Sequence, residues 1–168
     1  MKSGDKVYSS LVIGVDGANS KIREIQNIKT KNYGTKKYGL VAIMEHEISH
    51  PNVSWQVFSR TGILALLAKE IKPNKRAVSS LIWSLEKKQI EIIRNLSSKD
   101  FEKRVKKEFG CFLGDLQLIS KINIWPISRI DVPKPIGLRT VVLGDAAHSI
   151  YPLAGQGFNL AIGDLFLL

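Results

Sequence analysis

The pattern of apolar and polar positions predicts a chain built mainly from strands, with helices in its middle and at its end. Residues 11–13 and 141–143 are uninterrupted apolar runs, which are typical of short buried strands. Between them, turn residues separate four segments rich in Val, Ile and aromatic residues: 36–48, 53–59, 63–68 and 76–84. Because short turns join antiparallel neighbours, these segments predict an antiparallel meander.

Helical periodicity begins after the fourth of these segments. Residues 86–96 and 97–109 are predicted helices. In the second helix, Phe101, Val105 and Phe109 recur every four residues, with Lys and Glu on the other face. We therefore expect this helix to pack its aromatic face against the predicted sheet.

The remaining segments connect these regions. Residues 29–35 are polar and are expected to cross between two structural regions, and residues 116–126 predict a further strand. Residues 131–137 hold two prolines and predict a loop. Residues 158–168 are mostly apolar and predict a final helix.

The first apolar run leads into the tight turn Gly14-Val15-Asp16-Gly17, whose glycines permit close backbone approach or a positive φ. A polar residue at position 19 or 20 can cap the helix predicted over residues 21–26. Arg23 on that helix can pair with Asp16 or bind a phosphate through both arms of its guanidinium. The alternative is a capped helix with a surface arginine.

The second apolar run leads into a longer turn, residues 143–159, with the sequence LGDAAHSIYPLAGQGFN. Asp145 follows a strand at its carboxyl end, where α/β sheets bind cofactors, so its carboxylate can accept hydrogen bonds from ribose or ribityl hydroxyls. Gly155-Gln156-Gly157 opens a helix whose first N–H groups favour an anion. Leu160 stands where a dinucleotide fingerprint needs its third glycine. The alternative is a plain strand–loop–helix joint capped by Asp145.

His148 lies in this turn without a Ser or Cys nucleophile elbow nearby, so we expect it to pack or hydrogen-bond rather than catalyse. The histidines lack metal-ligand spacing with Cys111, so no metal site is predicted. Cys111 is the single cysteine, which excludes an internal disulfide, and we expect it to be a core residue.

The composition adds limits on the partner. The chain has 168 residues, 44% hydrophobic and 24% charged, which suits a folded globular protein. Its net charge of +10 is compatible with nucleic acid, an anionic membrane surface or an anionic cofactor. Because the Lys and Arg residues are spread out and not interleaved with aromatics, we predict no nucleic-acid partner and favour a role in solubility. No secretory signal and no apolar run of about 20 residues are visible, so a cytoplasmic location is expected.

The two turns together resemble those of one known family. Residues 13–23, IGVDGANSKIR, resemble the Asp-Gly motif of class A flavoprotein monooxygenases. Residues 143–159 resemble the Gly-Asp motif of the same family nearly residue for residue. Residues 38–67, which include Tyr38-Gly39 and Thr61-Gly62, are similar to the ubiquinone-biosynthesis hydroxylases within that family.

The resemblance implies an α/β (α+β) fold with two kinds of domain. Residues 1–33 and 129–168 would form part of an FAD-binding Rossmann-like domain, and residues 34–128 a substrate-binding, mainly antiparallel β-sheet domain flanked by helices. The implied activity is hydroxylation of a polyprenylated phenol in ubiquinone biosynthesis. It would use FAD, NAD(P)H and O2 and proceed through a flavin C4a-hydroperoxide.

The resemblance also implies cofactor-binding residues and no catalytic side chain. Asp145 would bind the ribityl chain of FAD, and Pro152 would lie beside the flavin ring. The amides of residues 155–157 would stabilise the anionic reduced ring. Asp16 would serve both FAD and pyridine-nucleotide binding, with Arg23 supporting that face. The full expected set is Asp16, Gly17, Arg23, Gly144, Asp145, Pro152, Gly155, Gln156, Gly157 and Asn159.

One departure from the family shapes the expected behaviour. The family begins with a strand and a G-x-G-x-x-G turn that this sequence does not contain, which implies the middle and late part of a longer protein. We expect residues 11–13 and 141–143 to lack strand partners, and the chain alone to bind FAD weakly or not at all. Expected partners are a companion N-terminal fragment, other ubiquinone-biosynthesis proteins and, peripherally, the inner membrane. The alternative is a non-enzymatic assembly piece of the ubiquinone-biosynthesis complex.

Overall fold

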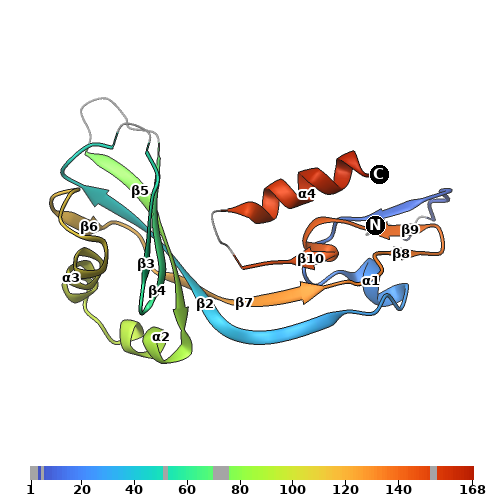
Figure 1. Ribbon diagram of the computed structural model, residues 1–168, viewed down its shortest axis with the longest axis horizontal. Coiled ribbons are helices and arrows are strands. Elements are labelled where there is room, and N and C mark those ends of the chain that lie inside the picture. The colour runs from blue at the N-terminus through green and yellow to red at the C-terminus, as the bar shows by residue number, and fades with distance from the viewer. Residues whose placement is uncertain (1–3, 5, 51–52, 70–75, 152–154) are drawn as a thin grey trace. The chain divides into compact units, whose positions relative to one another are not determined.

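The chain folds into two compact units, which the computed structural model places at residues 1–34 with 128–168 and at residues 35–127 (Figure 1). The structure describes residues 4, 6–50, 53–69, 76–151 and 155–168. Pro152, an expected cofactor-binding residue, lies outside the described residues. We call the two parts the split unit and the middle unit.

An antiparallel sheet forms the middle unit. Its strands are β2 (Lys31–His46), β3 (Trp55–Ser59), β4 (Gly62–Ala68) and β5 (Ala77–Glu86), in the spatial order β2-β5-β4-β3. β6 (Leu116–Leu118) also pairs with β2. The expected meander is therefore only partly right, because β2 pairs with β5 and not with β3.

The burial of β5 explains this order. Its residues are buried or half-buried along nearly the whole strand. The backbone N–H and C=O groups on both edges of the strand therefore need hydrogen-bond partners from neighbouring strands. β2 supplies a ten-residue partner on one edge, from Lys37 opposite Glu86 to His46 opposite Ala77. Turn residues show where strands end, but they do not determine which strands pair. For that reason the sequence pattern did not predict the pairing of β2 with β5.

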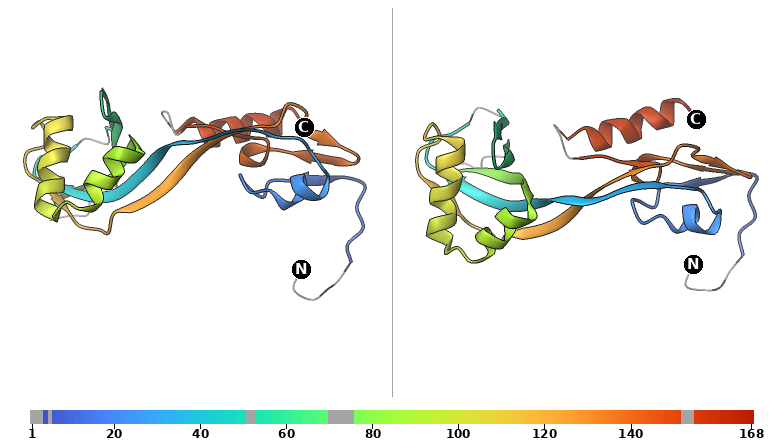
Figure 2. Two further views of the ribbon diagram at one scale, coloured as in Figure 1. Left: turned by 90° about the horizontal axis from the view of Figure 1, so that it is seen from below. Right: turned by 60° about the horizontal axis from the view of Figure 1, so that its bottom comes forward.

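Two helices cover one face of this sheet, α2 (Lys87–Arg94) and α3 (Ser98–Phe109) (Figure 2). As predicted, the aromatic face of α3 is buried. The Ser97 hydroxyl accepts a hydrogen bond from the Asp100 N–H, which caps the helix start, and Gly110 ends it with φ +98°. The core between sheet and helices is made of alternate strand residues and the inner helix faces: Leu40, Ala42, Met44, Leu64, Leu66, Leu81, Trp83, Leu85, Ile90, Ile93, Phe101, Val105 and Phe109.

Several expected boundaries were wrong. The polar segment expected to cross between regions contains the start of β2 at Lys31. Pro126 does not end a strand but lies within β7 (Asn123–Asp131). β10 (His148–Ser149) pairs with β7 only at Ile130 and Asp131, so at Pro126 a missing N–H breaks no bond to β10. Cys111 is exposed rather than part of the core.

The split unit contains a small mixed sheet. β1 (Val12–Gly14) runs parallel to β9 (Thr140–Val142), and β8 (Ile136–Gly137) pairs antiparallel on the other side of β9. The expectation that β1 and β9 lack partners was wrong, because they pair with each other. β9 is buried, whereas Val12 and Ile13 of β1 are each 41% exposed. The parallel pair here and the antiparallel sheet of the middle unit confirm the α/β (α+β) fold class.

Helices flank this small sheet. α1 (Lys21–Ile25) follows β1, a single 3₁₀ turn called η1 (Gly144–Ala146) follows β9, and α4 (Gln156–Phe166) lies near the end of the chain. α4 has no buried residue. No helix among the described residues has both the length and the apolar character needed to cross a bilayer.

Candidate functional site

Both sequence turns begin at the same edge of the small sheet. In the parallel register, Val12 lies opposite Thr140 and Gly14 opposite Val142. The Leu143 N–H extends the pairing by donating to the Gly14 carbonyl oxygen at 2.9 Å. The turns that carry Asp16 and Asp145 therefore leave from the carboxyl ends of adjacent parallel strands, where open α/β sheets bind ligands.

Two glycines permit the first turn to form. A Cβ on Gly14 would lie 3.0 Å from Val142 Cγ1 and 3.1 Å from Ile22 Cγ2, so a side chain there would push apart β9 and α1. Gly17 has φ +83°, which side chains rarely adopt. Both uses of glycine expected from the sequence are confirmed.

The carboxylate of Asp16 caps α1. Asp16 Oδ2 accepts hydrogen bonds from the N–H groups of Lys21 at 2.7 Å and Ile22 at 3.2 Å. A hydrogen bond from Ser20, together with these backbone donors, lowers the pKa of Asp16 below its ordinary value against the opposing effect of burial. The start of α1 is thus satisfied by the protein's own anion, and in this structure Asp16 holds the first turn together.

Arg23 joins the two turns. Its Nη1 donates to the Ala146 carbonyl oxygen and its Nη2 to the Ala18 carbonyl oxygen, both at 2.7 Å. The expected pairing of Arg23 with Asp16, or with a phosphate through both arms, is replaced by these two backbone bonds. A guanidinium presents a planar fork of donors, which suits it to connect two carbonyls at fixed spacing.

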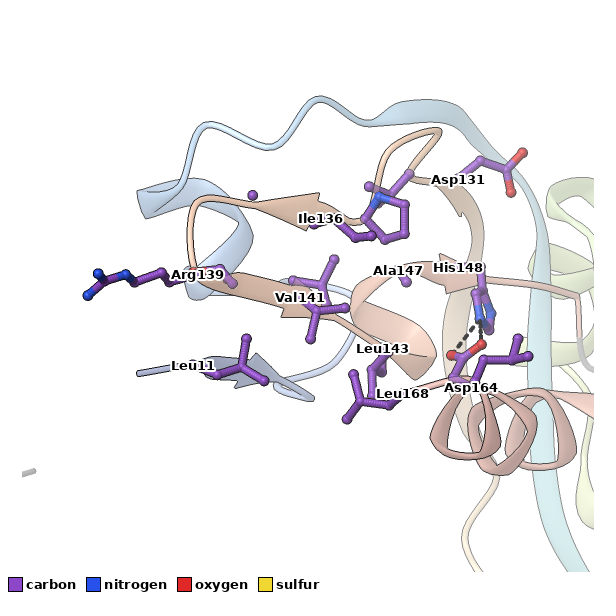
Figure 3. A pocket seen from close by; sticks show the side chains of 16 residues that line it. Leu11, Asp131, Ile136, Arg139, Val141, Leu143, Ala147, His148, Asp164 and Leu168 are labelled. Carbon is purple, nitrogen blue, oxygen red and sulfur yellow. Dashed lines mark hydrogen bonds and ion pairs between the residues drawn. The ribbon is translucent and has the colours of Figure 1, made fainter. Parts of the chain in front are cut away.

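The second turn is fixed by a contact from α4. Gly144 has φ +57°, and its N–H donates to Asp164 Oδ2 at 2.7 Å. His148 Nε2 lies 2.8 Å from the same oxygen, as the dashed lines in Figure 3 show. Burial of Asp164 acts to raise its pKa, but the hydrogen bonds from Gly144 and His148 outweigh it and leave the pKa below the ordinary value. His148 therefore makes the hydrogen bond expected of it, although its partner lies on α4 and not within the turn.

Asp164 is the site residue that the turn pattern did not single out. Its signal in the sequence is faint: it is the single charged residue of a mostly apolar helix, 16 positions after His148. Asp164 and His148 also line a mainly apolar cavity of about 610 Å³, together with side chains such as Val141, Leu143 and Leu168 (Figure 3). This cavity lies between the small sheet and the end of the chain.

Asp145 lines a separate cavity of about 460 Å³. Val15 and Gly17 of the first turn and Phe158 and Ala161 of α4 line the same cavity. Among the described residues that line it, Asp145 is the only charged one; its side chain is exposed and has no hydrogen bond to any of them or to another described residue. An ionised carboxylate beside apolar walls, with its acceptor oxygens free, is suited to bind ligand hydroxyls.

The start of α4 adds a second polar element beside this cavity. Gly155 is the N-cap, in the left-handed region with φ +66°, and no side chain among the described residues caps the helix. Gly157 in the first turn lines the cavity. The free N–H groups at the start of this 11-residue helix therefore favour an anion. α1 differs, because Asp16 and Ser20 satisfy its start.

The structure thus divides the expected site residues into three groups. Gly17, Gly144, Asp145 and Gly157 line one cavity. Asp16 and Arg23 do not line this cavity; they fix the conformation of the turns through the hydrogen bonds described above. Gln156 and Asn159 are exposed on α4, where Asn159 Nδ2 donates to Gln156 Oε1 at 3.4 Å, and Gly155 occupies the N-cap position without a capping side chain from the described part of the chain.

The sequence pattern of one protein family, described as an FAD binding domain, matches residues 2–168. The chain belongs to the FAD-binding domain family. Membership confirms the family predicted from the two turns, and with it FAD as the family's cofactor. The residues that line the Asp145 cavity fit such a group, because they combine free carboxylate oxygens, apolar walls and an uncapped helix start.

Relatives within this family include several ubiquinone-biosynthesis hydroxylases. Ubiquinone hydroxylase UbiL of Rhodospirillum rubrum is 29% identical over 168 residues, which are 100% of this chain and 38% of that protein. The mitochondrial ubiquinone biosynthesis monooxygenase COQ6 of Homo sapiens is 31% identical over 199 residues, covering 96% of this chain and 41% of that protein. The 3-demethoxyubiquinol 3-hydroxylase of Escherichia coli is 28% identical, covering 98% and 41%. The chain therefore spans about two fifths of these relatives.

Solved structures share the fold. PqsL of Pseudomonas aeruginosa, a probable FAD-dependent monooxygenase, superposes with a TM-score of 0.73 at 22% identity, over 96% of this chain and 45% of that one. CmlS, a flavin-dependent halogenase, superposes with a TM-score of 0.66 at 16% identity, over 90% of this chain and 28% of that one. These likenesses concern the arrangement of the backbone.

Proposed function

We propose that the chain supplies part of the FAD site and the substrate-binding sheet of a flavin-dependent hydroxylase in ubiquinone biosynthesis. The observation that carries this proposal is Asp145, a carboxylate without a partner among the described residues, in a cavity between two sequence turns and an uncapped helix start. The relatives named above supply the reaction class. Bound flavin would pass reducing equivalents from NAD(P)H to oxygen for the hydroxylation of a phenol.

The chain's own residues divide the work around the cofactor. Asp145 accepts hydrogen bonds from the cofactor's ribityl hydroxyls, and the first N–H groups of α4 stabilise negative charge. Arg23 and Asp164 keep the turns at fixed spacing from outside the cavity. In this proposal residues 1–33 and 129–168 form the cofactor domain.

The middle unit, proposed as the substrate domain over residues 34–128, offers a suitable face. Alternate residues on the sheet face away from α2 and α3 are aliphatic and only half-buried, among them Val41, Ile43, Ile63 and Ile82. An open aliphatic sheet face suits the hydrocarbon part of a polyprenylated phenol, because its burial removes apolar surface from water. No side chain there is proposed as catalytic.

The edge of the small sheet suggests how the cofactor domain is completed. β1 is the edge strand of its sheet, and exposed apolar edge strands are usually paired or covered. Val12 and Ile13 are each 41% exposed there. We propose that a segment outside this sequence, on the same polypeptide or a companion chain, pairs with β1 and completes the FAD site. The chain alone then binds FAD weakly or not at all and is inactive.

Flavin titration tests this proposal. We expect weak quenching of FAD fluorescence with the chain alone and strong quenching when it is co-expressed with the N-terminal part of the Escherichia coli relative. Asp145→Asn should weaken that complex about tenfold, because a charged acceptor is lost. Asp115→Asn, an exposed carboxylate of the middle unit, is the matched control and should leave binding unchanged.

Two results would contradict the proposal. One is that the complemented protein binds no flavin, and the other is that Asp145→Asn and Asp115→Asn behave alike. Stable capture of ubiquinone-biosynthesis proteins by a chain that binds no flavin would instead favour the non-enzymatic assembly piece.

A further inference from the structure

The tip of the β8–β9 hairpin exposes apolar side chains next to basic ones. Gly137 pairs with Thr140, so the hairpin turn consists of two residues, Leu138 and Arg139. Leu138 is 86% exposed and Ile136 is 62% exposed. Prolines at positions 133 and 135 limit the backbone freedom of the strand that leads into the turn. The end of the hairpin therefore holds two large aliphatic side chains in water, Ile136 in β8 and Leu138 in the turn.

The residues of this two-residue turn do not favour its backbone conformation. Arg139 has φ +50°, one of only two positive values at non-glycine residues among those described. Two-residue hairpin turns favour Asn and Gly at such positions, because a Cβ there is strained. Neither Leu138 nor Arg139 improves the local fold, so the fold alone does not account for this pair. Strain in an exposed loop points to a function for the side chains.

The surface beside the tip is positively charged. Residues 26–31 after α1 and residues 133, 134, 136 and 137 before the tip line a shared concavity of about 490 Å³. The described part of its lining includes Lys29, Lys31 and Lys134 and no acidic residue. The nearest acid along α1, Glu24, is bound to Lys21 at 2.7 Å. The Arg139 side chain points away from the neighbouring cavity in Figure 3, so a fourth cation borders the apolar tip.

We propose that this basic, apolar tip docks the protein on an anionic lipid bilayer. Leu138 and Ile136 enter the interfacial layer, and Lys29, Lys31, Lys134 and Arg139 contact lipid phosphates. Apolar side chains ringed by Lys and Arg are the composition that anionic bilayers attract, through burial of apolar surface and charge complementarity together. A nucleic acid would use the cations and leave the aliphatic side chains in water.

Vesicle sedimentation of the purified chain tests this docking. We expect binding to vesicles of phosphatidylcholine with phosphatidylglycerol, much weaker binding to phosphatidylcholine alone, and loss of binding at high salt. Leu138→Asp should reduce the partition coefficient about tenfold, because a charge replaces an aliphatic side chain that enters the bilayer. Lys29→Glu with Lys134→Glu should reduce it at least about twentyfold, at about fivefold for each of the two lysines lost.

Matched controls separate the tip from net charge. Lys88→Glu with Lys107→Glu makes the same charge change on exposed positions of α2 and α3 and should leave binding within about twofold. Arg139→Gly removes one cation and the strained φ, so it should raise the melting temperature while it weakens vesicle binding about fivefold. A fold defect cannot produce that pair of changes.

The proposal fails if both double variants lose binding equally, or if Leu138→Asp has no effect. It also fails if the chain binds a DNA duplex as tightly as anionic vesicles, with a loss on Lys replacement only. Flavin and substrate are absent from the assay, so its outcome is independent of the proposed FAD site.

Discussion

The guanidinium of Arg23 reaches across 123 sequence positions to the Ala146 carbonyl, and Nη1 donates to that oxygen at 2.7 Å. The second arm donates to the Ala18 carbonyl at the same distance. One side chain therefore sets the spacing between the turn after β1 and the turn after β9. The cavity that holds Asp145 lies between those turns, so its width depends on this connection.

Arg23→Lys should destabilise the protein by about 2 kcal/mol, because an ammonium can replace only one of the two charge-assisted bonds and leaves a carbonyl unpaired. Urea unfolding measures this loss. Lys21→Ala on the same helix removes only an exposed ion pair and should cost less than about 0.5 kcal/mol. Equal losses in the two variants would show that Arg23 does not link the turns.

Asp164→Asn should destabilise the protein at neutral pH by about 1–2 kcal/mol, because the acceptor for Gly144 and His148 loses its charge. The pKa of Asp164 is lowered in the folded state from an ordinary 3.8, so its stabilising effect is complete above that value. That effect disappears as the pH falls from 3.8 through the folded pKa. The difference in unfolding free energy between the two proteins should therefore shrink in acid, and a constant difference would contradict this role.

His46 should make the middle unit sensitive to mild acid. The ring is fully buried, and Nδ1 lies 2.8 Å from the Ile48 carbonyl oxygen and Nε2 3.0 Å from Ser79 Oγ. Burial, which outweighs the bond to Ile48, lowers the pKa of His46 from 6.5. Below pH 6.5 the unfolded chain takes up a proton that the folded chain resists, so stability should fall as the pH drops.

The pH dependence of urea unfolding distinguishes this effect from general acid sensitivity. His46→Gln should flatten the slope between neutral pH and about pH 5, whatever its effect on stability at pH 7. Ser79→Ala keeps the buried ring while removing one of its partners, so the slope should remain. A slope unchanged in His46→Gln would assign the effect to another group.

Gly144→Ala should cost about 2–3 kcal/mol, because the new side chain meets both a positive φ of 57° and Ala161 Cβ at 3.1 Å. Gly155→Ala has a similar φ of 66° but open space around the new Cβ, so it should cost only about 1 kcal/mol. Thermal unfolding of both variants measures the difference. If the costs are equal, the contact between η1 and α4 does not constrain the turn.

Local sequence determined much of this protein. Periodicity placed α3 with its buried Phe101, Val105 and Phe109, because a helix face repeats within one element. The glycines and aspartates of the two turns identified the family, because turn geometry and close approach restrict residue type locally. The turn pattern also singled out Asp145 and the start of α4, which line one cavity in the structure.

Only the tertiary structure decided which distant residues meet. The pairing of β2 with β5, the bonds of Arg23 to both turns and the bond of Asp164 to Gly144 join positions far apart in the chain. Nothing in the local pattern distinguishes an arginine that faces a phosphate from one that binds two carbonyls. Packing made that choice, because the parallel register of β1 and β9 brings the Ala146 carbonyl within reach of α1.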